Sequence, residues 1–131
     1  MNTMTIALVT EQFHCEKIID AASRLAEKTG TSLEVISIVS DEYPRNPQAM
    51  ERLFEVCREH GAVMTIEYNP EPSRVLGRMI DEKQPQNVVS GMPGKDNSIL
   101  HRLWVRFRQI HFYTVDAQNN LKMVTPLEFI A

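Results

Sequence analysis

The sequence has few of the features that mark secreted, membrane or metal-binding proteins. Of its 131 residues only two are cysteines, Cys15 and Cys57, and neither has the CxxC spacing of a redox or zinc motif. Two cysteines in segments with helical patterns are too few for a secreted disulfide framework. No apolar run approaches the roughly 20 residues that span a bilayer, and the first ten residues lack a signal-peptide pattern. We therefore expect a cytoplasmic protein with no membrane partner.

An excess of positive charge is also missing. The chain has 14 basic and 17 acidic residues and a formal net charge of −3, so it has no global basic field to hold a nucleic-acid backbone. Hydrophobic residues make up 43% and charged residues 24% of the chain, which is ordinary globular usage. We expect a single domain over residues 1–131, without a nucleic-acid partner.

Short apolar runs alternate with segments whose apolar residues recur at helical spacing. The runs predict strands at residues 5–10, 33–39, 63–68, 88–90 and 110–115. The helical stripes lie within residues 16–28, 50–57, 75–80 and 99–107. Strands that alternate with helices in this way predict an α/β fold, a parallel sheet with helices on both faces.

The residues just after the strands are the expected place for a ligand, because open parallel sheets bind ligands beyond the carboxyl ends of their strands. After the fourth strand, Gly91 and Gly94 permit close backbone approach, and Asn97 or Ser98 can cap the next helix. The start of a helix offers free N–H groups to a phosphate. Two glycines in such a loop are also common as simple turn residues, so both interpretations stay open.

Three stretches resemble the universal stress protein family. Residues 18–39 are similar to that family's first helix and second strand, residues 74–94 to its later helix, fourth strand and phosphate loop, and residues 100–104 to the segment before its fifth strand. The resemblance is greatest to the stress-protein-type domain of potassium-sensing histidine kinases. It implies a three-layer sandwich, adenine nucleotide alpha hydrolase-like, with a five-stranded parallel sheet in the order 3-2-1-4-5.

The resemblance also implies a nucleotide site, with departures. Family members that bind ATP carry a Gly-x2-Gly-x9-Gly-Ser/Thr pattern, in which Gly91 and Gly94 match but Trp104 and Val105 replace the final pair. Thr10 stands where ATP-binding members have Asp. Val39 matches in type a position of the family whose backbone contacts the adenine. The implied contacts for weakly bound ATP or another adenine nucleotide are therefore Thr10, Val39, Gly91, Gly94 and Ser98.

Two functions remain open. The first is a stress-protein-like regulatory domain that binds an adenine nucleotide weakly, which Gly91 and Gly94 favour. The alternative is a protein-interaction or dimerisation module of the same fold without a nucleotide, which Thr10 and Trp104 favour. We expect no enzyme activity, since no nucleophile and base, paired carboxylates or Walker loop is present.

Two smaller clusters have competing interpretations. His14, Cys15 and Glu16 are adjacent, but neighbouring loop residues seldom converge on one ion, so we expect no metal. Basic residues before and along the fourth helix form either an anion site or a solvated surface. They are Lys95, His101, Arg102, Arg106 and Arg108.

The end of the chain predicts self-association. If strand 110–115 ends the sheet, its open backbone groups and the apolar residues of the tail need a partner, and the commonest answer is a twofold homodimer. The resemblance points the same way, because members of the family often dimerise through their last strand. The rival prediction is that residues 121–124 fold back as a hairpin and cover this edge within one chain.

Overall fold

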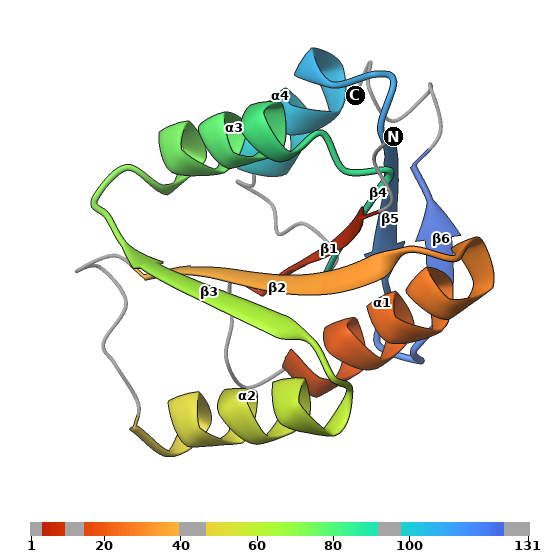
Figure 1. Ribbon diagram of the computed structural model, residues 1–131. Helices are drawn as coiled ribbons and strands as arrows, with labels where there is room; N and C mark the ends of the chain where they lie inside the picture. The colour runs from red at the N-terminus through yellow and green to blue at the C-terminus, as the bar shows by residue number, and fades with distance from the viewer. Residues whose placement is uncertain (1–3, 10–14, 40–46, 92–97, 125–131) are drawn as a thin grey trace.

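The computed structural model describes residues 4–9, 15–39, 47–91 and 98–124. These residues form one sheet between two layers of helices (Figure 1). The strands are β1 (Met4–Leu8), β2 (Ser32–Val39), β3 (Val63–Tyr68), β4 (Asn87–Gly91), β5 (His111–Val115) and β6 (Leu121–Met123). The helices are α1 (Cys15–Thr29), α2 (Pro47–Glu59), α3 (Pro72–Lys83) and α4 (Ser98–Arg106).

The strand order is β3-β2-β1-β4-β5-β6, and β1 to β5 run parallel. This confirms the α/β fold and the order expected for the five parallel strands. The sixth strand pairs antiparallel with β5, with Leu121 opposite Val115 and Met123 opposite Tyr113. The prediction that strand five ends the sheet is therefore wrong. The Asp116 carboxylate accepts bonds from the N–H groups of Gln118 and Asn120, at 2.9 and 2.8 Å, and this turn returns the chain to the edge of β5.

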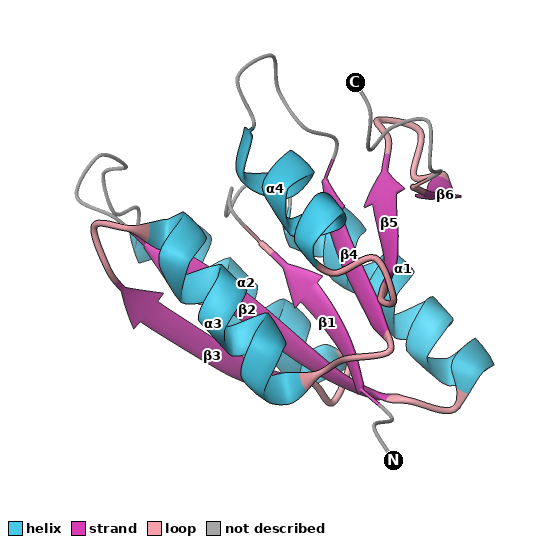
Figure 2. Cartoon of the chain, turned by 90° about the horizontal axis from the view of Figure 1, so that it is seen from above, coloured by secondary structure: helices cyan, strands magenta, loops and turns pink. Residues whose placement is uncertain are grey.

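The helices α1 and α2 cover one face of the sheet, and α3 and α4 cover the other (Figures 1 and 2). Successive side chains along residues 6–9 point to opposite faces of the sheet. Ala7 and Val9 therefore join the α1/α2 core, while Ile6 and Leu8 join the α3/α4 core. The strands buried on both faces are mainly apolar, as the sequence pattern predicts, and their buried polar residues include Thr5 and Asn87. None of the described helices is long and apolar enough to cross a membrane.

Glycine ends the two helices of the first layer. Gly30 follows α1 with φ 68°, and the Thr31 N–H donates to the Ala26 carbonyl at 2.8 Å. Gly61 follows α2 with φ 63° and the same pattern. This left-handed cap satisfies the last carbonyls of each helix and reverses the chain within a few residues. The next strand can then begin beside the sheet.

Hydrogen-bonded side chains close the amino ends of the central strands. The Asn87 amide donates to the hydroxyls of Thr5, at 3.0 Å, and of Thr29, at 3.2 Å. Thr31 joins the same group through its contacts with Thr5 and Thr29. Asn87 and Thr5 are fully buried, and these bonds pair the Asn87 amide nitrogen, while its Oδ1 atom has no hydrogen-bond partner among the described residues. The amino ends of β1 and β4 are thus tied to the end of α1, at the opposite edge from the expected ligand site.

Candidate functional site

The strand order reverses between β1 and β4, which lie side by side in the centre of the sheet. The chain leaves β1 for α1 on one face, and leaves β4 for α4 on the other (Figure 2). The helices that follow the two strands therefore lie on opposite faces, and in open α/β sheets ligands bind at such a switch point. We refer to the carboxyl edge between β1 and β4 as the β1/β4 crevice.

Gly91 is the last residue of β4 and lies at the β1/β4 crevice, beside the first turns of α1. A methyl group placed on Gly91 would meet the Cδ1 atom of Ile18 at 3.5 Å, an ordinary van der Waals distance. Its φ is not positive, in contrast to Gly30 and Gly61. Neither backbone conformation nor packing against the described residues therefore requires glycine at this position.

The other expected contacts are placed only in part. Val39 ends β2 and pairs with Tyr68 of β3, so its backbone reaches the same carboxyl edge as Gly91, on the other side of β1. Ser98 is the first residue of α4. The structure describes the backbone of these two residues and not their side chains. Thr10 and Gly94 lie outside the described residues.

The positions of the second half of the nucleotide motif, Trp104 and Val105, lie within helix α4. Trp104 lies towards the end of α4, only 2% exposed, within the α3/α4 core. Val105 is the next residue of the same helix, and its side chain is 44% exposed. Backbone N–H groups at this depth in a helix bond to the preceding turn, so they are not available to a phosphate. The short run from Gly94 to the helix start at Ser98 places both positions inside α4.

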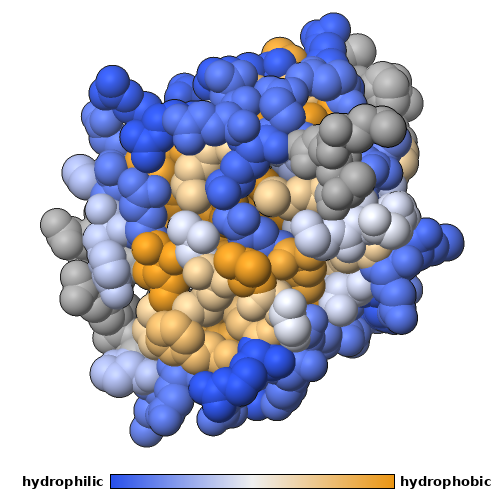
Figure 3. Space-filling view, viewed as in Figure 1, coloured by the Kyte–Doolittle hydropathy of each residue, from blue (hydrophilic) through white to orange (hydrophobic). Residues whose placement is uncertain are grey.

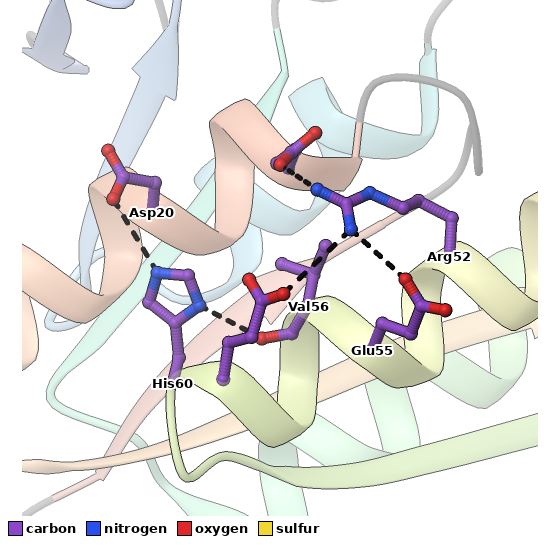
Figure 4. A network of polar contacts seen from close by, with 7 residues as sticks. Asp20, Arg52, Glu55, Val56 and His60 are labelled. Atoms are coloured by element: carbon purple, nitrogen blue, oxygen red, sulfur yellow. Dashed lines mark hydrogen bonds and ion pairs between the residues drawn. The ribbon is translucent and has the colours of Figure 1, made fainter.

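An ion-pair network joins α1 to α2 close to the crevice. Arg52 of α2 pairs with Glu16 in the first turn of α1, and also with Glu55 at 3.1 Å and Glu59 at 3.9 Å (Figure 4). The hydrogen bond to Glu16 is the main reason why the pKa of Arg52 is raised. Glu16 is the acidic residue of the first turn of α1, and Arg52 compensates its charge. An anion that approaches the start of α1 therefore meets less repulsion.

His60 and Asp20 make a second contact between the same helices. The His60 Nε2 atom lies 3.5 Å from an Asp20 carboxylate oxygen, and its Nδ1 atom lies 2.9 Å from the Val56 carbonyl (Figure 4). The ring therefore satisfies a carbonyl in the last turn of α2, as expected for a histidine at a helix end. This contact holds the two helices together and belongs to the scaffold.

The described polar residues near the start of α1 do not form a metal site. Cys15 is 1% exposed, and burial, followed by the charge of Glu16, raises the pKa of its thiol. A thiol that stays protonated is a poor metal ligand and a poor nucleophile at neutral pH. Within the described ranges, no three His, Cys, Asp or Glu side chains lie close enough together to hold an ion. His14 lies outside those ranges.

The basic residues of α4 lie around a shallow hollow. The hollow has a volume of about 320 Å³ and is lined by His101, Arg102, Val105 and Arg106. The guanidinium of Arg106 lies 4.8 Å from the centre of the Phe107 ring, in cation–π contact, and it also approaches Gly77 of α3. Arg106 therefore packs over the junction of the two helices. Lys95, the other expected member of this cluster, lies outside the described residues.

Comparison with known proteins gives a structural likeness. A crystal structure of a protein from the universal stress protein family from Burkholderia pseudomallei matches with a TM-score of 0.61. The match covers 86% of this chain and 95% of that chain at 16% sequence identity. No family model matches the sequence, and neither does any curated protein.

The sheet order and the β1/β4 crevice define an open α/β domain with one topological switch point. Within that class, the chain has the fold of the universal stress proteins. At this identity the likeness concerns the fold alone, and the ligand has to be argued from the residues of this chain.

Proposed function

We propose that this chain is a regulatory domain that binds ATP or another adenine nucleotide weakly in the β1/β4 crevice. The observation that carries the proposal is Gly91. It is glycine although its backbone and the described packing allow a side chain, which suggests that a ligand approaches the main chain there. The backbone ends of Val39 and Ser98 provide the adenine and phosphate sides of the proposed site, and Thr10 and Gly94 complete it. No chemical step is part of the proposal.

The binding should be weak because Trp104 and Val105 cannot supply the phosphate contacts that a glycine and a hydroxyl would make. A hydrogen bond to a charged group contributes about 1.5–3 kcal/mol. Losing one such bond lowers affinity by roughly ten- to more than a hundredfold. We therefore expect dissociation constants in the micromolar range or weaker.

Calorimetry and thermal-shift titration of the full chain with ATP, ADP, AMP and cyclic dinucleotides test this proposal. A ligand that binds only the folded state raises the unfolding temperature as its concentration increases. We expect saturable binding of at least one adenine nucleotide. A submicromolar ATP affinity, or no response to any of these compounds, would contradict the proposal.

A pair of glycine variants tests the role of the crevice. Gly91→Ala should fold with an almost unchanged unfolding temperature, because its new methyl group meets Ile18 at an ordinary distance. It should weaken nucleotide binding by roughly tenfold or more if the ligand touches the main chain there. Gly77→Ala is the control in α3, where the new methyl group would lie 2.7 Å from the Nη1 atom of Arg106 and only the end of that side chain has to shift. Unchanged affinity in Gly91→Ala would remove the main support for this site.

The second candidate function is a protein-interaction module without a nucleotide. The burial of Trp104 favours it, because the helix that would hold phosphates is used to build the core. The arginines of α4 do not decide between the two candidates, since a solvated surface accounts for them equally well. A chain that ignores all nucleotides but associates with a protein would support this second function.

A further inference from the structure

The strand β3 is an open edge of the sheet. Among the described residues it pairs only with β2, so every second residue turns its N–H and C=O groups away from the sheet. The strand has six residues and contains neither lysine nor proline. Those are the devices that usually protect an edge from pairing with another strand. β3 is therefore able to accept a further strand.

Apolar side chains surround this edge. Met64 packs against the α1/α2 core, so Ile66 and Tyr68, at two-residue steps from it, point to the same face. Tyr68 is 54% exposed, and Phe54 of the neighbouring helix α2 is 49% exposed. Figure 3 shows apolar residues gathered in the middle of the face that carries β3, with hydrophilic residues above and below. Patches of this kind mark interaction sites more often than chance.

The other face of β3 is polar and already paired. Thr65 donates to Glu34 at 3.2 Å, and Glu67 pairs with Arg78 of α3 at 3.3 Å. Glu67 is the one charged residue of the strand. A partner strand must therefore offer apolar groups on the α2 side and must not place a carboxylate opposite Glu67.

A second copy of β3 meets both requirements. We propose that two chains pair antiparallel through β3 around a twofold axis perpendicular to the sheet, with Ile66 opposite Ile66 of the second copy. This register places Met64 opposite Tyr68 on the apolar face. It places Glu67 opposite Thr65 on the polar face, so no like charges are opposed. The alternative register, with Thr65 at the axis, sets exposed Val63 against the carboxylate of Glu67.

The axis also brings the two α2 helices onto the same face of the joined sheet, because α2 covers that face in each chain (Figure 1). Phe54 lies on that helix, with half of its surface still exposed. The pairing thus covers the open backbone and the apolar patch with one symmetric interface, the commonest form of self-association. This inference goes beyond the proposed nucleotide binding and does not depend on it.

Analytical ultracentrifugation of the full chain tests the interface. We expect reversible dimers. Ile66→Lys should raise their dissociation constant by roughly tenfold or more, because this register places two lysines opposite each other at the axis. The control is Met123→Lys on β6, whose side chain is 46% exposed, and this change should leave dimers intact. Ile66 is half-buried, so Ile66→Lys should lower the unfolding temperature of the monomer, and both variants are compared at a temperature where each is folded. Both should keep the nucleotide response of the original chain. A monomer at all concentrations, or a dimer lost in Met123→Lys alone, would overturn the proposal.

Disulfide trapping tests the register independently. In Ile66→Cys the two new thiols should lie opposite each other, with Cα atoms about 4.5–5.5 Å apart, which suits a disulfide. Tyr68→Cys is the control, since its mate would be four positions away, although its side chain is more exposed. The native Cys15 and Cys57 are both buried. We expect mild oxidation to give covalent dimers of Ile66→Cys only. Equal trapping at both positions would contradict the register, and pairing of β3 with a peptide from another protein, without self-association, would contradict the dimer.

Discussion

The two edges of the sheet end in different ways. On one side β3 has six residues, with Met64, Ile66 and Tyr68 on one face and with Val63 64% exposed. On the other side β6 has three residues, all exposed, with Lys122 at its centre. Short length and a lysine are typical protections of an edge strand, and β6 has both. Within the described residues, the chain therefore closes the β5 edge by itself and places no second strand beside β3.

Aromatic side chains follow the same division. Trp104 of α4 and Phe112 of β5 are buried near the closed edge, whereas Phe54 and Tyr68 are exposed near the open one. Val124, just beyond β6, is buried in the α3/α4 core, and its N–H donates to the Phe112 carbonyl at 2.8 Å. The closed edge is thus continuous with the core, while the open edge has apolar surface still to bury.

The largest expected effect is a difference in the free energy of unfolding between aromatic variants at the two edges. Trp104→Ala should lower the free energy of unfolding by about 3–5 kcal/mol, because it leaves a large cavity in the α3/α4 core. Phe54→Ala should lower it by only about 1 kcal/mol in the monomer, since half of that ring is already exposed. Urea unfolding at low protein concentration measures both. Similar losses in the two variants would contradict the difference between the edges.

A smaller effect concerns Cys57, on the same helix as Phe54. It is 3% exposed, and burial raises the pKa of its thiol from 9.0 to about 11. Because the folded pKa is the higher one, the protonated thiol favours the folded state fully below pH 9. This contribution, about 2–3 kcal/mol, is lost as pH rises from about 9 through 11.

Urea unfolding at about pH 8 and about pH 11 measures the Cys57 effect, with Cys57→Ala as the control. The variant should lose less stability than the original chain over this interval. Equal losses would mean that α2 is not packed over the sheet as the structure shows.

The smallest effect lies in the turn before β6. Hydrogen bonds from the Asn120 N–H and other groups of the turn lower the pKa of Asp116 below 3.8. A lowered pKa means that this contribution is present above pH 3.8 and is lost as pH falls through the folded value. The hairpin should therefore loosen in acid before the sheet unfolds. Amide exchange at Asn120 and Val124 measures this, and Asp116→Asn should remove the pH dependence. Unchanged exchange in acid would show that the turn does not hold β6.

Much of the fold could be predicted from the sequence because the apolar patterns are local. Residues 33–39 and 63–68 form strands as expected, and the stripe of Val75, Leu76, Met79 and Ile80 is buried in α3. The order of the five strands came from the family resemblance. The place of residues 121–123 could not be decided, because the same apolar residues suit a partner chain or the chain's own edge.

The site was less predictable, for different reasons. Motif spacing aligned Trp104 with a phosphate contact, but the early start of α4 at Ser98 places this residue inside a helix and its ring in the core. The pairing of Arg52 with Glu16 joins residues on separate helices, and no sequence pattern announces such a contact. Thr10 and Gly94 stay predictions.

The most direct test of the account compares hydrogen exchange in the two edges at low and high protein concentration. We propose that β5 is covered by β6 of its own chain, and β3 by the β3 strand of a second copy. Amides of residues 111–115 should then exchange at the same slow rate at both concentrations. In residues 63–68, the amides that bond to β2 should also stay protected, while the outward amides of every second residue become protected only as dimers form. Protection that grows with concentration in β5 and not in β3 would contradict it.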